Sequence, residues 1–269
     1  RTIANPLVGT KLTGKVGGAS IGYLGAIDEF EDQDDVFANL LRLRQDVGGT
    51  STIGGLYTDR TRSEDEYNRV VGADGRFVFA RRYTLSLQAA RSWDKNPGEE
   101  RTAGNLGFME IQRAGRAFRT KLSVFDTDEN FHTESGFLRR TGEVQVNLSD
   151  TRYQWFGKPG AFFESFGPGV EFKGFWDHDA FWGGDAMKEA EFQLQWTMSL
   201  RNNVTIWTTA SRTMFDFAAD DYDGLFVNEG GEQRSPFSPD QELFDALYNV
   251  RIFAFFSGWE RIRGRVTLD

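Results

Sequence analysis

The stretch from Ala190 to Leu200 reads AEFQLQWTMSL, in which apolar and polar side chains alternate without a break. Successive side chains of a β-strand point to opposite faces, so the stretch predicts one strand with an apolar face that carries Phe192, Leu194 and Trp196. The same alternation recurs along the chain, and its polar positions are rich in Arg, Gln and Thr. Strands that are apolar outside and polar inside are typical of outer-membrane β-barrels.

The composition of the 269-residue chain is polar but compatible with such a barrel. Charged residues make up 26% of the chain and its mean hydropathy is -0.49. No stretch approaches the roughly 20 apolar residues of a membrane-spanning helix, which excludes a helical membrane protein. Aromatic residues reach 14%, and 30 Gly with only 6 Pro suit tight turns and unbroken strand ladders. The absence of cysteine excludes disulfides, thiolate metal sites and cysteine nucleophiles.

The charge distribution also fits a pore. The net charge of -9 and the pI of about 4.9 disfavour a nucleic acid as a partner. Acidic residues cluster between strand-like runs, most densely at residues 28–35 and 216–223, whereas the polar faces of the predicted strands are more basic. Acidic loops around basic strand interiors are expected of a pore, and acidic loops that merely keep a protein soluble are the alternative.

The strand pattern predicts an antiparallel architecture. We expect about 13 to 15 strands of about 8 to 11 residues, a length that barrels use. Gly17-Gly18 is a two-residue hairpin signal, and tight turns alternate with long acidic connections, as in outer-membrane barrels. Residues 241–248 allow one or two helical turns. The sequence therefore predicts an all-β fold, an antiparallel transmembrane β-barrel in which residues 1–269 form a single domain.

The two ends of the chain lead to a further expectation. The chain begins at Arg1 without Met or a signal peptide, and it ends at Asp269 without the terminal aromatic residue that is common in outer-membrane barrels. We expect the chain to be truncated at both ends relative to a full protein and to be part of a larger barrel.

Four stretches together resemble one bacterial family. They are TKLTGKVGG at residues 10–18, IGGLYTDR at 53–60, NRVVGAD at 68–74, and ENF with ESGFLRR at 129–131 and 134–140. In this order they resemble the barrel region of the domain-of-unknown-function 5916 family, whose proteins carry an N-terminal family-9-like carbohydrate-binding domain. The resemblance covers most of the chain and implies an outer-membrane β-barrel with a sugar-binding-like module upstream. It brings no catalytic residues.

Charged residues on the polar faces of the predicted strands are candidates for the wall of a lumen. Rows of Arg on one strand face are costly against lipid and favourable against water or carboxylates. Such Arg residues would either favour anionic solutes or pair with lumenal Glu and stiffen the wall. The lumen-facing candidates are Arg42, Arg44, Arg261, Arg263, Arg265, Glu143, Glu171 and Glu191.

Aromatic residues near strand ends are candidates for an interfacial girdle. Amphipathic rings collect at the headgroup level of outer-membrane barrels. The alternatives are the core of a soluble sandwich or a platform on which sugars stack. The girdle candidates are Trp155, Phe156, Phe162, Phe163, Trp176 and Trp182.

The sequence gives little evidence for a metal ion and none for catalysis. The acidic loop with Asp216, Asp220, Asp221 and Asp223 is a weak Ca²⁺ candidate, because the first ligand and the closing Glu of a calcium loop are missing. We expect no other cofactor. No Gly-x-Ser-x-Gly elbow is present, and His132 and His178 each fit an ordinary loop or turn, so we do not expect an enzyme.

These features predict a porin-like protein of a Gram-negative outer membrane. It would act as a passive channel or as the membrane anchor of a sugar-binding-like module or an envelope complex. The expected partners are outer-membrane lipids, envelope proteins and small anionic or sugar solutes, with no nucleic acid. The alternative is a soluble, secreted β-sandwich that binds carbohydrate. An outer-membrane hydrolase is a third hypothesis, which lacks a catalytic constellation.

Overall fold

The fold is all-β and antiparallel. The computed structural model describes residues 5–30, 33–136, 138, 140–201, 204–217, 224–228, 234–237, 241–254 and 262–268. These residues form 17 strands, of which three have two or three residues and the other 14 have 7–15. No closed barrel is found among the described residues. The all-β, antiparallel class is therefore confirmed, and a transmembrane barrel stays a prediction.

The contacts divide the chain into two compact units. The first unit contains residues 1–113 and 123–145, and the second contains residues 114–122 and 146–269. The division falls within β8 (Phe118–Thr127) and within β9 (Glu143–Tyr153), so each of these strands contributes residues to both units.

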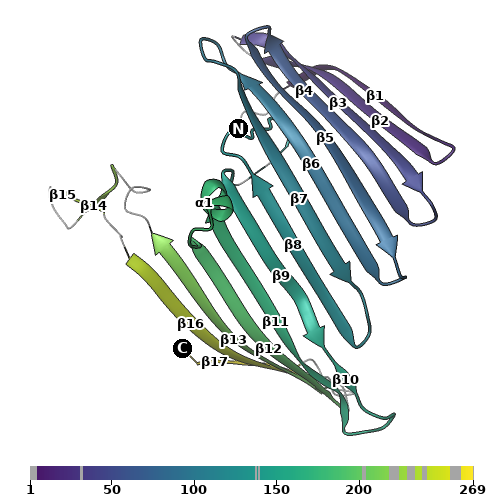
Figure 1. Cartoon of the computed structure of the whole chain (residues 1–269), viewed down its shortest axis with the longest axis vertical. Helices are drawn as coiled ribbons and strands as arrows, with labels where there is room; N and C mark the ends of the chain where they lie inside the picture. Colours follow the sequence, from purple (N-terminus) through teal and green to yellow (C-terminus); the bar gives the residue numbers. More distant parts are fainter. Residues whose placement is uncertain are drawn as a thin grey trace. The chain divides into compact units, whose positions relative to one another are not determined.

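In the first unit, seven long strands follow one another in a meander, each paired with its sequence neighbours (Figure 1). In the turn between β1 and β2, Gly17 and Gly18 have φ angles of 56° and 86°, as the hairpin signal requires. The strands are β1 (Asn5–Val16), β2 (Ala19–Phe30), β3 (Gln33–Val47), β4 (Ser51–Ser63), β5 (Glu66–Phe79), β6 (Tyr83–Lys95) and β7 (Thr102–Arg113).

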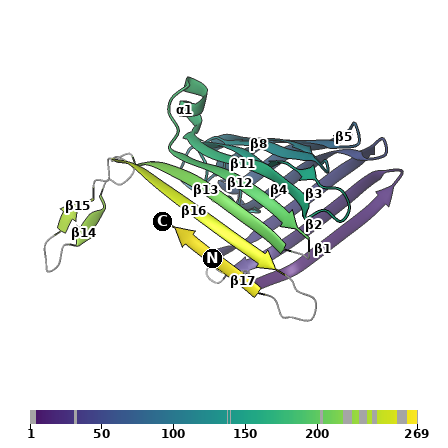
Figure 2. The same ribbon diagram turned by 90° about the horizontal axis from the view of Figure 1, so that it is seen from below.

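In the second unit, β9 is followed in the hydrogen-bonded order by five long strands, and the short helix α1 comes directly after β11 (Figure 2). Two-residue β10 pairs with the beginning of β11, and β14 and β15 form a small separate hairpin. The elements are β10 (Trp155–Phe156), β11 (Phe163–Asp177), α1 (His178–Gly183), β12 (Glu189–Leu200), β13 (Val204–Phe217), β14 (Phe226–Asn228), β15 (Arg234–Pro236), β16 (Gln241–Ala254) and β17 (Ile262–Leu268).

Two expectations about the connections are wrong. Residues 241–248 are strand rather than helical turn, because β16 pairs with β13 along its entire length, from Gln241 to Ala254. The acidic segments are also less loop-like than expected: β2 runs to Phe30, and β4 and β5 are joined by a turn of only two residues, 64 and 65. Charged residues are compatible with a hydrogen-bonded strand wherever water reaches their side chains, so acidity alone does not end a strand.

Each unit has an apolar face, and the opposite face is polar. The strand registers place Phe192, Leu194 and Trp196 of β12 on one face, where Leu194 is 52% exposed. In the first unit the apolar face is likewise exposed, and its members include Leu12, Val16, Ile21, Leu43, Val47, Ile53, Val71, Leu87, Met109 and Ile111.

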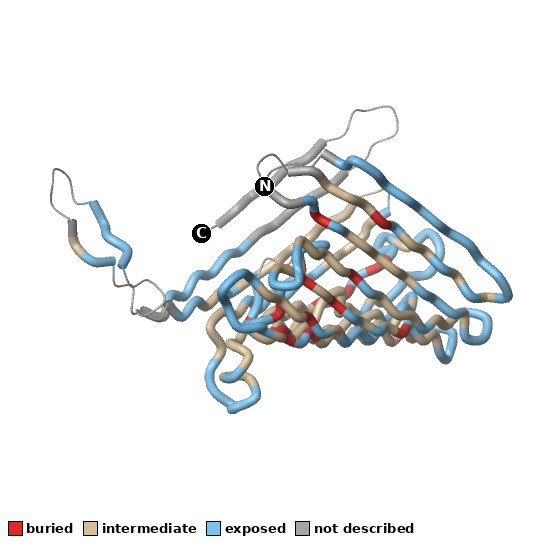
Figure 3. Tube along the Cα trace, turned by 90° about the horizontal axis from the view of Figure 1, so that it is seen from above, coloured by how far each residue is buried: buried red, intermediate tan, exposed pale blue. Residues whose placement is uncertain are grey.

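Burial is therefore inverted relative to an ordinary soluble core. The buried residues form short, scattered stretches along the strands (Figure 3), and polar residues are as numerous among them as apolar ones. Large apolar side chains are mostly exposed instead, although soluble domains bury this type preferentially. The buried residues other than glycine are Val36, Val70, Leu106, Phe131 and Val144, and Thr58, Asn68, Ser92, Thr127 and Ser165.

Candidate functional site

The most organised part of the molecule is a strap in the first unit. The strap, which consists of the described residues 128–136, 138 and 140–142, lies between β8 and β9 in the sequence and against the polar side of β4–β7. We call that side the strap face. Phe131 of the strap is only 4% exposed and packs against Val70 and Leu106, with Ala90 beside them. The strap thus covers an apolar patch on the strap face with an apolar anchor.

Asn68 of β5 fixes the strap by its side-chain amide. Asn68 is 1% exposed; its amide nitrogen donates to the carbonyl oxygen of His132 at 3.1 Å and to Asp94 at 2.9 Å. Its amide oxygen accepts the backbone N–H of Glu134 at 3.0 Å. Ser92 of β6 adds a further hydrogen bond, because its hydroxyl accepts the N–H of His132 at 3.1 Å. These bonds satisfy polar groups that would otherwise be costly to bury.

A hydrogen bond of the His132 ring and an ion pair add to this attachment. The Nδ1 atom of His132 lies 3.1 Å from Asp94, and Arg60 of β4 lies 3.1 Å from Glu134. The strap is therefore held by β4, β5 and β6 together.

Gly104 of β7 makes room for the strap backbone. A Cβ atom at this position would lie 2.1 Å from the nitrogen of Phe131 and 2.4 Å from the carbonyl carbon of Asn130. Both of these are backbone atoms, which cannot move aside as a flexible side chain would. Glycine is therefore required here because another part of the backbone approaches the strand closely.

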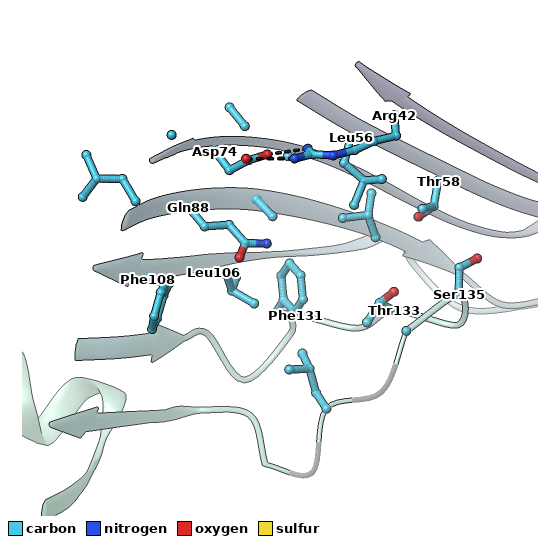
Figure 4. A pocket seen from close by; sticks show the side chains of 18 of the residues that line it. Arg42, Leu56, Thr58, Asp74, Gln88, Leu106, Phe108, Phe131, Thr133 and Ser135 are labelled. Atoms are coloured by element: carbon cyan, nitrogen blue, oxygen red, sulfur yellow. Dashed lines mark hydrogen bonds and ion pairs between the residues drawn. The ribbon is translucent and has the colours of Figure 1, made fainter. Parts of the chain in front are cut away.

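A cavity of about 630 Å³ lies between the strap and the strap face. Its size falls within the range of about 300–1,000 Å³ that is usual for small-molecule sites. At one end, Arg42 of β3 makes a two-bond ion pair with Asp74 of β5, with Nη2 to Oδ1 at 2.8 Å (Figure 4). The guanidinium crosses β4 at Gly54, where a Cβ atom would lie 2.9 Å from Nη2. Gln88 lies next to Asp74 in the register.

The other end of the cavity carries hydroxyl groups. Thr133 and Ser135 of the strap lie here with Thr58 of β4 (Figure 4). Thr58 is 5% exposed and its Oγ1 atom has no hydrogen-bond partner among the described residues. The cavity thus has apolar lining residues, among them Val70, Leu106 and Phe131, and hydrogen-bond donors and acceptors at both ends. Such a lining is suited to a small polar solute.

The lumen candidates fall in both units. Arg42 and Arg44 are on the strap face, and Arg42 pairs with Asp74 rather than with any of the three predicted Glu residues. Glu143 pairs instead with Arg140 of the strap at 2.6 Å. Neither of these two ion pairs joins a candidate Arg to a candidate Glu.

The remaining lumen candidates belong to the second unit. Glu191 lies opposite Lys173, and Glu171 lies opposite Gln193, so both Glu residues share the polar face of β11 and β12. Arg263 and Arg265 lie opposite Phe253 and Arg251 in the register of β17, although their side chains are outside the described set. Arg261 lies outside the described residues altogether.

The girdle candidates form two groups at the two ends of β11. Trp155 stacks on Phe166 with ring centres 5.3 Å apart, and Phe163 contacts Phe166 at 6.4 Å. Phe156 and Phe162 lie in the same region, paired with β11 and in contact with Phe163, respectively. At the other end, Phe181 contacts Trp176 at 5.4 Å and Trp182 at 5.2 Å. Most of these rings are exposed, Trp182 to 68%.

The calcium candidate is largely untested. Asp216 is exposed near the end of β13, and Asp220, Asp221 and Asp223 lie outside the described residues. Within the described part of the chain, no group of three or more His, Cys, Asp or Glu side chains is placed to hold a metal ion.

The sequence did not point to Asn68, Thr58 or Asp74, because their importance depends on strands and a connection distant in sequence. One signal was available: the strap interrupts the strand alternation yet carries Phe131 and Leu138, two apolar residues in a polar connection. Such residues are a sign that a connection packs against the fold.

Comparison with known proteins gives no further information. No family model, curated protein or solved structure matches the chain. Within the described residues, no helix is long and apolar enough to cross a bilayer.

Proposed function

We propose that this chain is part of the wall of a transmembrane β-barrel in a Gram-negative outer membrane and that it acts as a passive channel for small solutes, narrowed by the strap. The resemblance to the domain-of-unknown-function 5916 family supports the same location. The observation that carries the proposal is the apolar face of β11 and β12, which is exposed and bounded by aromatic groups at both ends.

The spacing of the two aromatic groups matches a bilayer. Phe166 and Trp176 are on the same face of β11, ten residues apart. At about 3.3 Å per residue, ten residues span about 33 Å along the strand. A strand tilt of about 40° reduces this to a height of about 25 Å, the height of the apolar band of outer-membrane barrels.

The first unit has a band of similar length. On the apolar face of β5 and β6, Phe79 stacks on Tyr83 at the tight-turn end, with ring centres 5.4 Å apart. At the other end, Arg69 pairs with Asp59 at 2.9 Å and covers the ring of Tyr67. Charged pairs at this position are compatible with the interface, where a charge on the lipid side costs about 0–1 kcal/mol, but not with the middle of the band.

The strap favours a narrowed channel over an empty pore. It occupies part of the polar face of the first unit and is fixed there by Asn68, Ser92 and Phe131. A soluble sandwich would instead place a second sheet or a connection over the apolar face, which remains exposed over most of its described residues.

The first experiment is the dependence of folding on detergent, measured by heat-modifiable gel migration and circular dichroism. We expect a β-rich, heat-modifiable species only in detergent or lipid, and ion conductance after insertion into planar bilayers. A compact monomer in plain buffer would overturn the membrane proposal and favour the soluble carbohydrate-binding protein. Insertion without conductance would support a membrane anchor instead of a channel.

A matched pair of variants tests which face meets lipid. Leu194→Arg places a charge on the apolar face of β12, and we expect it to reduce the free energy of folding in lipid by about 2–4 kcal/mol. Gln193→Arg places the same charge on the polar face, opposite Glu171, and should be tolerated. Equal effects of the two variants would contradict the assignment of the faces.

A further inference from the structure

We infer that the tight-turn end of the strap face is a cationic vestibule that makes the proposed channel selective for small anions of the carboxylate or phosphate class. The inference rests on the proposed function, because it assigns the solutes that the lumen admits. It concerns residues of β1, β3 and β5 at and beyond the end of the strap cavity, where Arg42 lines that cavity and Lys15 and Arg44 line the hollow next to it.

The register brings five cationic side chains to one region of the strap face. Lys11 lies opposite Leu24, which lies opposite Leu40 and then Thr58, so Lys11 shares the face that lines the cavity. The same relation holds for the other members, since cross-strand neighbours point to the same side of a sheet. The cationic residues are Lys11, Lys15, Arg42, Arg44 and Arg76.

Two carboxylates compensate only part of this charge on β1–β5. Asp46 pairs with Lys15 at 2.7 Å, and Asp74 pairs with Arg42. Lys11, Arg44 and Arg76 are exposed and have no carboxylate at ion-pair distance among the described residues. The region is thus locally positive, although the whole chain carries a net charge of -9.

The cations surround a hollow rather than a flat surface. Lys15, Arg44 and Arg76 line a space of about 480 Å³ beside the turn between β3 and β4, together with Asp46. Gly54 lies between Arg44 and Asp74 in the register, and the guanidinium of Arg42 occupies the space over it, so the hollow lies on the turn side of this ion pair. Concave surfaces that carry one sign of charge concentrate the opposite ion.

The arrangement favours anions over neutral solutes as the selected class. A neutral solute accepts hydrogen bonds from these cations but gains no net Coulombic attraction, whereas rings of Arg and Lys are the usual basis of selectivity in anion and phosphate pores. Glu110, which lies on β7 opposite Ser86, is the nearest acidic residue in the register beyond this region. It is separated from Arg76 by one strand, β6.

The test is the reversal potential of the ionic current that the full chain carries across planar bilayers under a KCl gradient. We expect chloride to be about two- to fivefold more permeable than potassium, with less preference at high salt, which screens the fixed charges. The double variant Arg44→Glu with Arg76→Glu should reverse the preference. The matched control, Arg44→Lys with Arg76→Lys, keeps both charges and should retain it.

The outcomes separate this inference from the proposed channel. Conductance with a preference for potassium, or a preference for chloride that the double Glu variant leaves unchanged, would overturn the cationic vestibule and leave the channel in place. Absence of conductance from a correctly inserted protein would overturn both. Heat-modifiable migration of each variant establishes that a change in selectivity does not come from misfolding.

Discussion

The attachment of the strap is tested most directly by adding one methyl group to β7. In Gly104→Ala, the new Cβ atom would lie 2.1 Å from the nitrogen of Phe131, whereas ordinary Cβ contacts lie at 3.4–4 Å. The strap backbone must therefore retreat by about 1.3 Å or more, the difference between these distances. Gly107→Ala is the matched control, because a Cβ atom there meets nothing within 4 Å.

The cost of this retreat follows from the contacts that it breaks. Phe131 would lose much of its burial, which contributes about 1.5–3 kcal/mol. Three hydrogen bonds, from Asn68 to His132, from Glu134 to Asn68 and from His132 to Ser92, contribute about 0.5–1.5 kcal/mol each. The total of about 3–7 kcal/mol is enough to release the strap, while the ladders of β1–β7 stay intact.

Hydrogen exchange and trypsin cleavage measure the release. The backbone N–H groups of His132 and Glu134 should lose their protection in Gly104→Ala, and cleavage after Arg140 should accelerate. Both should remain as in the wild type in Gly107→Ala. If the N–H groups of His132 and Glu134 exchange as slowly in Gly104→Ala as in the wild type, the close contact between β7 and the strap is not present in the protein. The proposed narrowing of the channel would then lose its basis.

Two further substitutions test the polar contacts of the same face. Asn68→Leu leaves the carbonyl oxygen of His132 and the N–H of Glu134 without their partner in a buried position. We therefore expect the free energy of unfolding, measured in urea on the detergent-folded protein, to fall by about 2–4 kcal/mol. An unchanged free energy of unfolding would indicate that water replaces the amide. Arg42→Met and Asp74→Leu, measured singly and together, should give a coupling energy of about 1 kcal/mol, because both side chains are about one-third exposed. Strictly additive effects would show that this ion pair contributes nothing to stability.

The strand faces could be predicted from the sequence because they depend only on the alternation of side chains. Phe192, Leu194 and Trp196 share an exposed face as expected, and Gly17-Gly18 forms the expected turn. Strand ends were less predictable. Acidic residues were interpreted as loops, yet the hydrogen-bonded ladder continues through Asp28 and Glu66, because a strand whose side chains meet water tolerates charge.

The site was mostly beyond prediction because it is made by residues distant in sequence. Arg42 was correctly singled out as a polar-face residue, but its partner Asp74 lies two strands away and is reached only because β4 has Gly54 between them. Asn68 meets the strap across 64 residues of sequence. A local sequence pattern cannot predict such a contact. The alternation of side chains predicts which face of the strand Asn68 is on, but not which residue it binds.

The polar groups of the strap face have different roles in its two halves. On the side of Asn68, Ser92 and Asp94, donors and acceptors are consumed in holding the strap, and glycine at position 104 lets the backbone approach. On the side of Arg44 and Arg76, neither cation has a carboxylate at ion-pair distance among the described residues, and both line the hollow beside the turn between β3 and β4. Exposed cations are hydrated and cost little to keep, so the two halves differ in what they leave accessible: the half with Arg44 and Arg76 keeps its charges available to an anion. In the proposed channel, this is the half that a solute would contact.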